Sequence, residues 1–528
     1  MVAGGNSFMW HDAPRRVFQS DFPIFKFHGA ERRATLVRRG ASCDWLILFE
    51  ALYIMTQPSY PKIAQLRSVE RFQARLSELG LNLPCDEQLL SRAQGSPLAE
   101  PLRVGALSCG NRWCIHPMEG WDAECDGSPS ELTIRRWQRF GESGAKLIWG
   151  GEAAAVQAAG RANPHQTLAT PSNEAGLRTL LGALQRAHVE HGETLDDLVV
   201  GLQLTHSGRF CKPNDHRRWE PRIAYHHPLL DAKFGIAEDD QQVVLSDSEL
   251  ERLIDDYVVS AKLAQRVGFQ FVDVKACHGY LLHEMLSARC RPGKYGGELA
   301  GRSRLMRTII GRIRDECPGL GIGVRLSVFD TLPYQPGETG GVPMAWSPTQ
   351  PYEYGFGVDA EDPLKIDLRE PLELLQMLHS LGVEWVNLTC GSPYYSPHIQ
   401  RPAIFPPSDG YHPPEDPLVG VARHIHMTAE VKAQLPELVL VGSGYTYLQE
   451  FLPLVAQAAV RAGMVDVVGL GRMVLSYPRL PRDSLAGIKP ARKLICRTFS
   501  DCTTAPRSGL VSGCYPLDPF YKSRPERP

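Results

Sequence analysis

Residues 438–472 have the sequence LVLVGSGYTYLQEFLPLVAQAAVRAGMVDVVGLGR. Two short apolar runs, 438–444 and 465–471, flank a stretch of helical period at 447–462, and each run ends in glycines. A buried strand, a helix and a second buried strand in this order form a βαβ unit, whose two strands lie parallel in one sheet. This stretch therefore predicts a parallel α/β fold.

The same alternation extends back along the chain to about residue 104. Eight apolar runs are predicted strands, at 113–118, 146–153, 198–204, 271–275, 321–327, 384–389, 438–444 and 465–471. Stretches of helical period separate them, at 130–143, 173–191, 247–267, 302–317, 369–381, 421–434 and 447–462. A doubly wound open sheet is the rival fold, but no G-x-G-x-x-G follows the first strand. Eight parallel strands are the number that closes a barrel, so the predicted fold class is an α/β (β/α)₈ TIM barrel.

The barrel is expected over residues 101–490. A partly irregular N-terminal extension is expected at 1–100, with little packed structure in its first 54 residues, and a C-terminal tail at 491–528 is expected to pack on the barrel. Two stretches rich in Pro, Gly and Tyr, 330–363 and 391–418, follow the fifth and sixth strands. Insertions in these positions form long loops over the C-terminal face of a barrel, where a lid or substrate wall is expected.

Composition argues against several classes of partner. The chain has 528 residues and a formal net charge of −2, so neither nucleic acid nor an anionic membrane surface is expected to bind it. The apolar segment 44–55 is too short to cross a membrane and carries Asp44 and Glu50. Thirteen cysteines without a disulfide framework predict reduced thiols and a cytoplasmic location. A small molecule is the expected partner, and a homo-oligomer is left open.

The carboxyl ends of the strands supply the active-site residues of a barrel, and here they carry an unusual set. The set comprises His116, Pro117, Met118 and Glu119 after the first strand, Gln203 and Thr205–Arg209 after the third, Lys275, His278 and Tyr280 after the fourth, Arg325 on the fifth, Ser443 and Gly444 after the seventh, and Gly471 and Arg472 after the eighth. Glycine turns expose backbone N–H groups and Arg472 adds a planar charged fork. The last two strand ends therefore suit a phosphate.

Several stretches around these strand ends resemble the Old Yellow Enzyme family of NAD(P)H:flavin oxidoreductases, which is related to the barrel domain of 2,4-dienoyl-CoA reductase. They are NRWCIHPMEG (111–120), GGEAAAVQAAGR (150–161), GLQLTHSGR (201–209), DVKACHGYLLHEMLSARCRPGKYGGELAGRSRL (273–305), VRLSVFD (324–330), and VGSG with GLGR. These six blocks occur in the family's order, span about 111–472, and include a highly specific motif, HGYLLHEML…KYGG…R.

The resemblance implies non-covalently bound FMN and NAD(P)H as the hydride donor. By position, the implied cofactor residues are Pro117, Met118 and Glu119 along the flavin ring, Ala153 at its pyrimidine side, Gln203 and Arg325 at the flavin carbonyls and N1, and Ser443, Gly444, Gly471 and Arg472 around the phosphate. An arginine at N1 would stabilise the negative charge that reduced flavin gathers there.

The family usually places a His–His or His–Asn pair after the fourth strand to bind a substrate carbonyl oxygen. A Tyr two residues later donates a proton. Here the pair is Lys275 and His278, followed by Tyr280. Lys275 departs from the family pattern, although an ammonium still donates hydrogen bonds and would favour an anionic oxygen, including that of a carboxylate. The alternatives are a Lys275 that points to solvent and a His278 that belongs to the core.

Glu119 is a second departure, because many members carry Cys or Thr at this position. A carboxylate beside the flavin would lower the flavin potential or act as a base. Alternatively, Glu119 faces away from the flavin and caps a loop.

Larger relatives of the family carry an iron–sulfur motif, C-x₂-C-x₃-C-x₁₁-C, after the barrel. Cys502 and Cys514 have the spacing of its last interval, but five residues separate Cys496 from Cys502 and the local C-x₂-C is absent. Three cysteines do not make the usual Cys₄ set, so the tail is predicted to hold no cluster, and no metal site is predicted elsewhere.

The resulting hypothesis is an FMN-dependent ene-reductase that takes hydride from NAD(P)H and reduces an α,β-unsaturated carbonyl or related compound. Lys275 and His278 would hold the substrate oxygen while Tyr280 protonates the α carbon. One alternative is an FMN-dependent dehydrogenase or oxidase of an amine or saturated ring, which Lys275 and Glu119 leave open. Another is a non-catalytic flavin-binding barrel, against which the presence of Tyr280 and Arg325 argues.

Overall fold

The computed structural model describes residues 59–347 and 349–526, so the expectations for residues 1–54 and for the apolar segment 44–55 lie outside the described residues. Eight parallel strands form a closed ring: β3 (Trp113–Ile115), β4 (Leu147–Ile148), β6 (Val199–Thr205), β7 (Phe271–Val274), β8 (Gly321–Ser327), β11 (Trp385–Thr389), β12 (Val439–Gly442) and β13 (Val467–Leu470). The ring closes because β4 pairs with both β3 and β6. The predicted (β/α)₈ barrel is confirmed.

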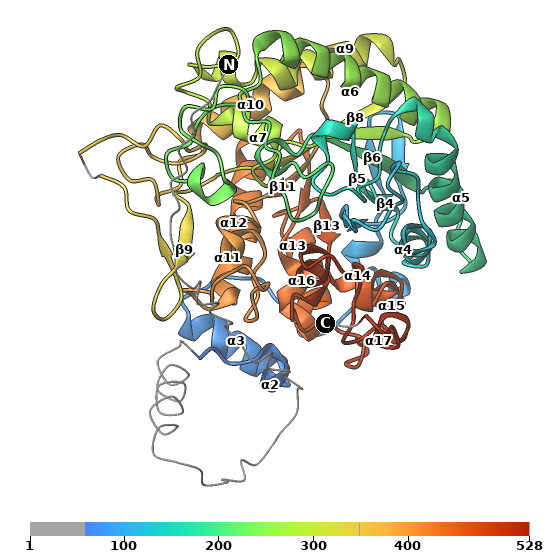
Figure 1. The fold of residues 1–528 in the computed structure, drawn as a ribbon. Coiled ribbons are helices and arrows are strands. Elements are labelled where there is room, and N and C mark those ends of the chain that lie inside the picture. The colour runs from blue at the N-terminus through green and yellow to red at the C-terminus, as the bar shows by residue number, and fades with distance from the viewer. Residues whose placement is uncertain (1–58, 348, 527–528) are drawn as a thin grey trace, which may run out of the picture. The chain divides into compact units, whose positions relative to one another are not determined.

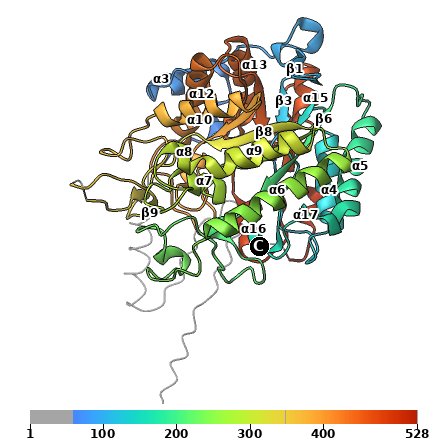
Figure 2. The same ribbon diagram turned by 90° about the horizontal axis from the view of Figure 1, so that it is seen from above.

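Helices alternate with these strands and surround them (Figures 1 and 2). The seven predicted helices are observed as α4 (Glu131–Gly141), α5 (Glu174–Glu190), α6 (Asp247–Val267), α9 (Arg304–Glu316), α10 (Arg369–Ser380), α12 (Pro417–Gln434) and α13 (Leu452–Arg461). Local sequence sets the ends of α6. Ser246 and Glu249 form a reciprocal capping box at its start, and Gly268 ends it with φ of 108°, a left-handed conformation that glycine adopts without strain.

An aromatic layer fills the interior of the barrel. The ring centroids of Trp149 and Trp385 lie 5.6 Å apart, and those of Phe271 and Trp385 lie 4.4 Å apart. Gly201 on β6 makes room for this layer, because a Cβ there would lie 2.3 Å from the Phe271 ring. The aromatic rings thus take the place of a pore, and the open space of the barrel lies at the carboxyl ends of its strands.

The segment before the first barrel strand packs on the barrel where the structure describes it. It contains α2 (Ile63–Leu66), α3 (Val69–Glu78) and a short antiparallel hairpin of β1 (Leu102–Val104) and β2 (Leu107–Cys109). Phe72 of α3 stacks on Phe451, which precedes α13, with ring centroids 4.3 Å apart. Residues 59–100 therefore share the hydrophobic core of the barrel.

The two insertions differ in their relation to the barrel mouth. Residues 391–418 contribute several side chains to the central pocket described below, as expected of a substrate wall. Residues 330–363, which include β9 (Tyr334–Pro336) and β10 (Gly341–Pro343), contribute none among the described residues. They contact the second insertion instead: the backbone N–H of Tyr334 donates to the carbonyl of Tyr395 at 2.8 Å. The first insertion therefore supplies no wall of this pocket among the described residues, and a lid role for it stays a prediction.

The C-terminal tail packs on the barrel through α16 (Asp501–Arg507) and α17 (Pro519–Lys522). Arg135 of α4 forms an ion pair with Asp518 at 2.9 Å, and its guanidinium lies over the Phe520 ring at 4.3 Å. Across residues 59–347 and 349–526, no helix has the length and apolar character that a bilayer crossing requires.

Candidate active site

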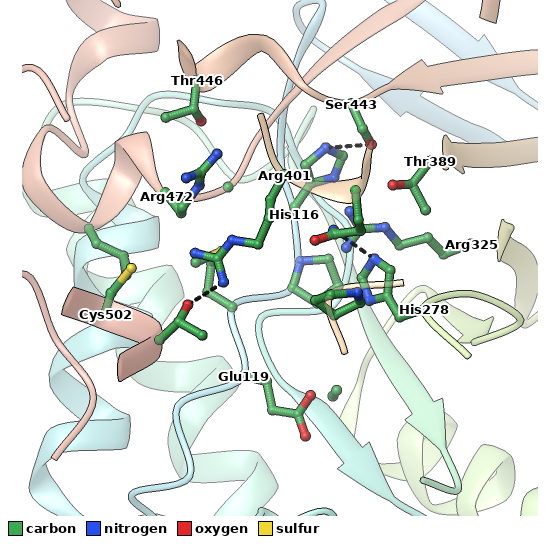
Figure 3. Close-up of a pocket in the computed structure, with 18 of the residues that line it drawn as sticks. His116, Glu119, His278, Arg325, Thr389, Arg401, Ser443, Thr446, Arg472 and Cys502 are labelled. Atoms are coloured by element: carbon green, nitrogen blue, oxygen red, sulfur yellow. Dashed lines mark hydrogen bonds between the residues drawn. The ribbon is translucent and has the colours of Figure 1, made fainter. Parts of the chain in front are cut away.

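One pocket at the carboxyl ends of the strands gathers the predicted site residues (Figure 3). Its volume is about 220 Å³. Its walls include Pro117, Met118, Glu119, Ala153, Gln203, Lys275, His278, Tyr280, Arg325, Ser443, Gly444, Gly471 and Arg472. Strand ends far apart in the sequence are thus brought to one place by the closure of the barrel.

The end of the pocket at β12 and β13 carries Ser443, Gly444, Gly471 and Arg472. Buried His116 positions the Ser443 hydroxyl, since Asn387 Nδ2 lies 3.0 Å from His116 Nδ1 and Ser443 Oγ lies 3.1 Å from His116 Nε2. Burial, followed by the Arg325 charge, lowers the pKa of His116 well below its usual value, so the ring is neutral. Because Asn387 donates to Nδ1, the ring donates through Nε2 to Ser443.

Arg325 supplies to the same pocket a positive charge that has no ion-pair partner among the described residues. Its side chain is buried, its Nε has no hydrogen-bond partner within the described part of the chain, and no carboxylate oxygen lies within ion-pair distance of it there. Asp273 accepts hydrogen bonds from the backbone N–H of Arg325 at 2.7 Å and from Gln203 Nε2 at 2.5 Å. Burial raises the pKa of Asp273 to about 6. Asp273 thus fixes both residues and leaves the Arg325 guanidinium available to a ligand.

Lys275 and Glu119, the two departures from the family pattern, contact each other. Lys275 Nζ lies 3.5 Å from Glu119 Oε2 and 3.6 Å from the centroid of the Tyr280 ring. The Lys275 side chain is 3% exposed, so the alternative that it points to solvent is wrong. Glu119 also faces the pocket, where it accepts a hydrogen bond from Trp121 Nε1 at 2.8 Å, so the alternative that it faces away is wrong as well.

Tyr280 places its hydroxyl between two polar partners. The hydroxyl donates to Glu119 Oε2 at 3.2 Å and lies 3.2 Å from the hydroxyl of Tyr394. Burial, followed by the Glu119 charge, raises the pKa of Tyr280 well above its usual value. The side chain is therefore a protonated phenol at neutral pH and can donate that proton.

His278 has a left-handed backbone, with φ of 68°. Two hydroxyls hold this uncommon conformation: the His278 N–H donates to Ser327 Oγ at 3.1 Å, and Ser392 Oγ donates to the His278 carbonyl at 2.8 Å. Burial lowers the pKa of His278 well below its usual value, so the ring is neutral. Its Nε2 lies 3.1 Å from Gln400 Nε2, which leaves Nδ1 as the donor nitrogen.

The residues after the third strand, apart from Gln203, do not line the pocket. Arg209 is buried and forms ion pairs with Asp231 and Glu284. The His206 Nδ1 accepts the backbone N–H of Gly208 at 3.1 Å, and burial lowers its pKa to about 3. Residues 205–209 therefore do not form part of the pocket, and the contacts of His206 and Arg209 stabilise the fold.

Sequence reasoning missed the pocket residues that come from loops and from the tail. The second insertion supplies Tyr394, Gln400 and Arg401, while the tail supplies Cys502, Thr503 and Arg507. None lies at a strand end or in a periodic segment. The one available signal was the position of the second insertion after the sixth strand, which predicted a pocket wall without naming its residues.

The three tail cysteines lie close together. Cys496, Cys502 and Cys514 line a small cavity of about 20 Å³ beside Arg472. Burial raises the pKa of both Cys496 and Cys514. Across the described ranges, no group of three or more His, Cys, Asp or Glu side chains is arranged to hold a metal ion.

The pocket fits FMN in the chemistry of its donors. Arg325 Nε and Arg472 Nη1 are both buried without hydrogen-bond partners among the described residues, which is costly for a charged group unless a ligand accepts from it. Arg472 follows Gly471 in the sequence and lines the same pocket as Gly444, which suits a phosphate site. Arg325 lies on the other side of the pocket, near His278 (Figure 3), where it can meet a second electron-rich group.

Comparison with known proteins shows a similarity to flavin oxidoreductases. The profile of the NADH:flavin oxidoreductase / NADH oxidase family matches residues 97–340. The match covers a little under half of the chain, which is similar to this family over that stretch. The resemblance to Old Yellow Enzymes is thereby confirmed, and so is the interpretation of the chain as an oxidoreductase.

Individual relatives are distant. An NADH:flavin oxidoreductase of Gibberella zeae is 24% identical over 397 residues, which are 72% of this chain and 83% of the relative. The NADPH dehydrogenase of Bacillus subtilis is 26% identical over 247 residues, 44% of this chain and 64% of that enzyme. Among solved structures, a 2-naphthoyl-CoA reductase complex superposes with a TM-score of 0.57 at 17% identity, covering 81% of this chain and 57% of that one. This last similarity supports the fold alone.

Proposed function

We propose that this chain is an FMN-dependent ene-reductase that uses NAD(P)H to reduce an activated alkene, such as an α,β-unsaturated carbonyl compound. The observation that carries the proposal is a protonated, buried Tyr280 beside Lys275 and His278, in the pocket that also holds the unpartnered Arg325. These groups supply what the reaction needs: an oxygen-binding pair, a proton donor and a cation for developing negative charge.

When bound, FMN would supply a two-electron carrier that accepts hydride from a nicotinamide and delivers it to the alkene. Pro117, Met118, Glu119 and Ala153 would line the ring, Gln203 and Arg325 its pyrimidine, and Ser443, Gly444, Gly471 and Arg472 the phosphate. Stabilisation by Arg325 is worth most where water is excluded, and its side chain is buried.

The substrate half of the reaction belongs to three side chains. Lys275 Nζ and His278 Nδ1 donate hydrogen bonds to the carbonyl oxygen and so draw electron density away from the β carbon. As the β carbon receives hydride, the π electron pair of the alkene moves to the α carbon. The O–H bond of Tyr280 then breaks and the new C–H bond forms at the α carbon. Tyr394, 3.2 Å from the Tyr280 hydroxyl, is placed to pass a proton back.

Oxidation of an amine is the second candidate, because Glu119 places a carboxylate among the aromatic rings of Trp121, Tyr280 and Tyr394. Carboxylates and aromatic faces suit an ammonium ion. Lys275 already occupies that role, however, since its ammonium contacts both Glu119 and the Tyr280 ring. Anaerobic mixing separates the candidates: bleaching of the flavin spectrum by NADPH supports the ene-reductase, while bleaching by an amine and not by NAD(P)H overturns it.

The purified protein is expected to contain FMN, and Arg472→Ala is expected to weaken its binding by about 2 kcal/mol, the scale of a hydrogen bond to a charged group. The physical reason is that Arg472 Nη1 is buried without a hydrogen-bond partner among the described residues, in the pocket that Gly444 and Gly471 also line. Heat release followed by chromatography identifies the cofactor, and titration of the apoprotein gives the affinity. FAD in the extract, or no flavin at all, overturns the prediction.

Lys275→His is expected to shift substrate choice toward neutral enones and away from unsaturated acids by about 1–3 kcal/mol in the ratio of kcat/KM. The substitution removes the ammonium and leaves the Glu119 charge without its ion-pair partner, so a carboxylate substrate meets repulsion where it met attraction. Kinetics with one neutral enone and one unsaturated acid measure the ratio. Lys262→His is the control, because Lys262 is 43% exposed and pairs with Glu316. An unchanged ratio means that Lys275 does not contact substrate.

A further inference from the structure

Three arginines in the pocket lack the carboxylate partners that most other buried arginines of the described chain have. Arg136, Arg209, Arg291 and Arg302 each form at least one ion pair with Asp or Glu. By contrast, no Asp or Glu oxygen of a described residue lies within 4.0 Å of the guanidinium nitrogens of Arg325, Arg401 or Arg472. Arg401 Nε and Arg472 Nη1 are both buried, and neither has a hydrogen-bond partner among the described residues.

Arg401 and Arg472 lie close together, on the side of the pocket away from Arg325 and His278 (Figure 3). Arg472 Nη2 donates to the carbonyl of Pro402 at 3.0 Å, next in sequence to Arg401. Burial, followed by the charge of Arg472, lowers the pKa of Arg401. Two neighbouring guanidinium groups that repel each other, and that have no ion-pair partner within 4.0 Å among the described residues, favour the binding of an anion from outside the chain.

The expected anion has about two negative charges. A phosphate monoester carries roughly −1.5 to −2 at neutral pH, and three oxygens that accept hydrogen bonds from guanidinium forks. Thr446 lies on this side of the pocket (Figure 3), Gly471 directly precedes Arg472, and Gly444 lines the same pocket. The pair of arginines thus matches the phosphate of FMN in both charge and position.

The C-terminal tail holds Arg401 in this place. Arg401 Nη1 donates a hydrogen bond to Thr503 Oγ1 of α16. Further contacts tie the loop that carries Arg401 to the tail: Ser500 Oγ donates to the Phe405 carbonyl at 2.7 Å, and the Ser408 N–H donates to Thr504 Oγ1 at 3.1 Å. The tail and the second insertion therefore close the phosphate side of the pocket together.

We propose that Arg401, positioned by Thr503, is a second ligand of the FMN phosphate, and that the C-terminal tail is consequently part of the cofactor site. This inference rests on the proposed FMN-dependent function. The strand-end residues of the phosphate site are thus joined by Arg401 from a loop, which Thr503 of the tail holds in position.

The test compares FMN with riboflavin, which has the same ring and ribityl chain but no phosphate. The full-length protein is stripped of flavin and titrated with each compound while flavin fluorescence is followed. Arg401→Ala is expected to weaken FMN binding roughly 10- to 100-fold, as the loss of hydrogen bonds to a charged group does, and to leave riboflavin binding unchanged. Thr503→Val, which keeps the charge, is expected to give a smaller loss that is again confined to FMN.

The control is Arg497→Ala. Arg497 lies in the same tail but pairs with Glu450 and does not line the pocket, so the affinity for both flavins is expected to stay unchanged. Equal losses of FMN and riboflavin affinity in the Arg401 and Thr503 variants, or no loss in either, overturn the inference and leave the proposed function intact. Wild-type protein that binds neither flavin overturns the proposed function and this inference with it.

Discussion

Tyr280→Phe is expected to slow the reoxidation of reduced flavin by an enone roughly 10²- to 10⁴-fold, the usual contribution of a general acid. Reduction of the flavin by NAD(P)H is expected to stay unchanged, because that half-reaction needs no proton from this residue. The substitution removes only the hydroxyl that donates to Glu119, and the ring can keep its contact with Lys275.

The protonation state of Tyr280 makes the prediction specific. Burial and the Glu119 charge raise the pKa of Tyr280 well above its usual value, so the phenol keeps its proton across the neutral pH range. The Tyr280 side chain is almost fully buried, so water has little access to take over its role as proton donor. Loss of the hydroxyl would thus remove the proposed proton donor to the α carbon.

Stopped-flow kinetics under anaerobic conditions measure the two half-reactions separately. Tyr394→Phe is the matched control, because it removes the hydroxyl 3.2 Å from Tyr280 and leaves the proposed donor in place. Its effect on reoxidation is expected to be smaller. If Tyr280→Phe reoxidises at the wild-type rate with a true substrate, or if Tyr394→Phe shows the larger loss, Tyr280 is not the proton donor.

The barrel could be predicted from sequence because its strands are buried on both faces. Such strands are short continuous apolar runs, and helices of clear period separate them. The β1–β2 hairpin was missed for the converse reason: each of its strands has three residues, too few for a period to be visible. The β9–β10 hairpin lies in a Pro- and Gly-rich insertion, where the same limit applies.

The strand-end residues of the site could be predicted because a closed parallel barrel brings the carboxyl ends of all its strands to one face. The pairing of Lys275 with Glu119 could not. Lys275 and Glu119 each depart from the family pattern, but the sequence gives no sign that the two side chains are in contact. The structure places their charges 3.5 Å apart, so one departure compensates the other. Arg401 and Thr503 were missed because 102 residues separate two side chains that meet only through the packing of a loop on the tail.

Arg136→Met is expected to lower the free energy of unfolding by about 3–5 kcal/mol, the scale on which breaking a buried ion pair destabilises a protein. Arg136 of α4 is 4% exposed and pairs with Asp122 at 2.5 Å and with Glu152 at 2.9 Å. The Gly120 N–H donates to Glu152 Oε2 at 3.3 Å, so the same network holds the loop that carries Glu119. The substitution leaves two buried carboxylates beside the active site without the cation that pairs with them.

The loss of unfolding free energy in Arg136→Met is also expected to depend on pH. Burial raises the pKa of Glu152 above its usual value, while the Arg136 charge opposes that rise. Without Arg136 the folded-state pKa rises further above that of the unfolded chain. A group shifted in this direction contributes stability below its unfolded pKa and loses it as pH rises through its folded pKa. The variant should therefore approach the wild type near pH 5 and fall further behind it toward about pH 8.

Urea unfolding of both proteins at several pH values, followed by circular dichroism, measures these differences. Arg178→Met is the control, because Arg178 is 56% exposed and its ion pair with Glu174 lies on the surface, where such pairs contribute about 0–1 kcal/mol. If Arg136→Met lowers the free energy of unfolding no more than the control does, the folded protein tolerates buried Asp122 and Glu152 without the Arg136 charge. A deficit that narrows as pH rises would mean that the carboxyl groups do not titrate as their burial requires. Either result would remove the electrostatic basis for the position of the Glu119 loop and require another explanation for its place beside Tyr280.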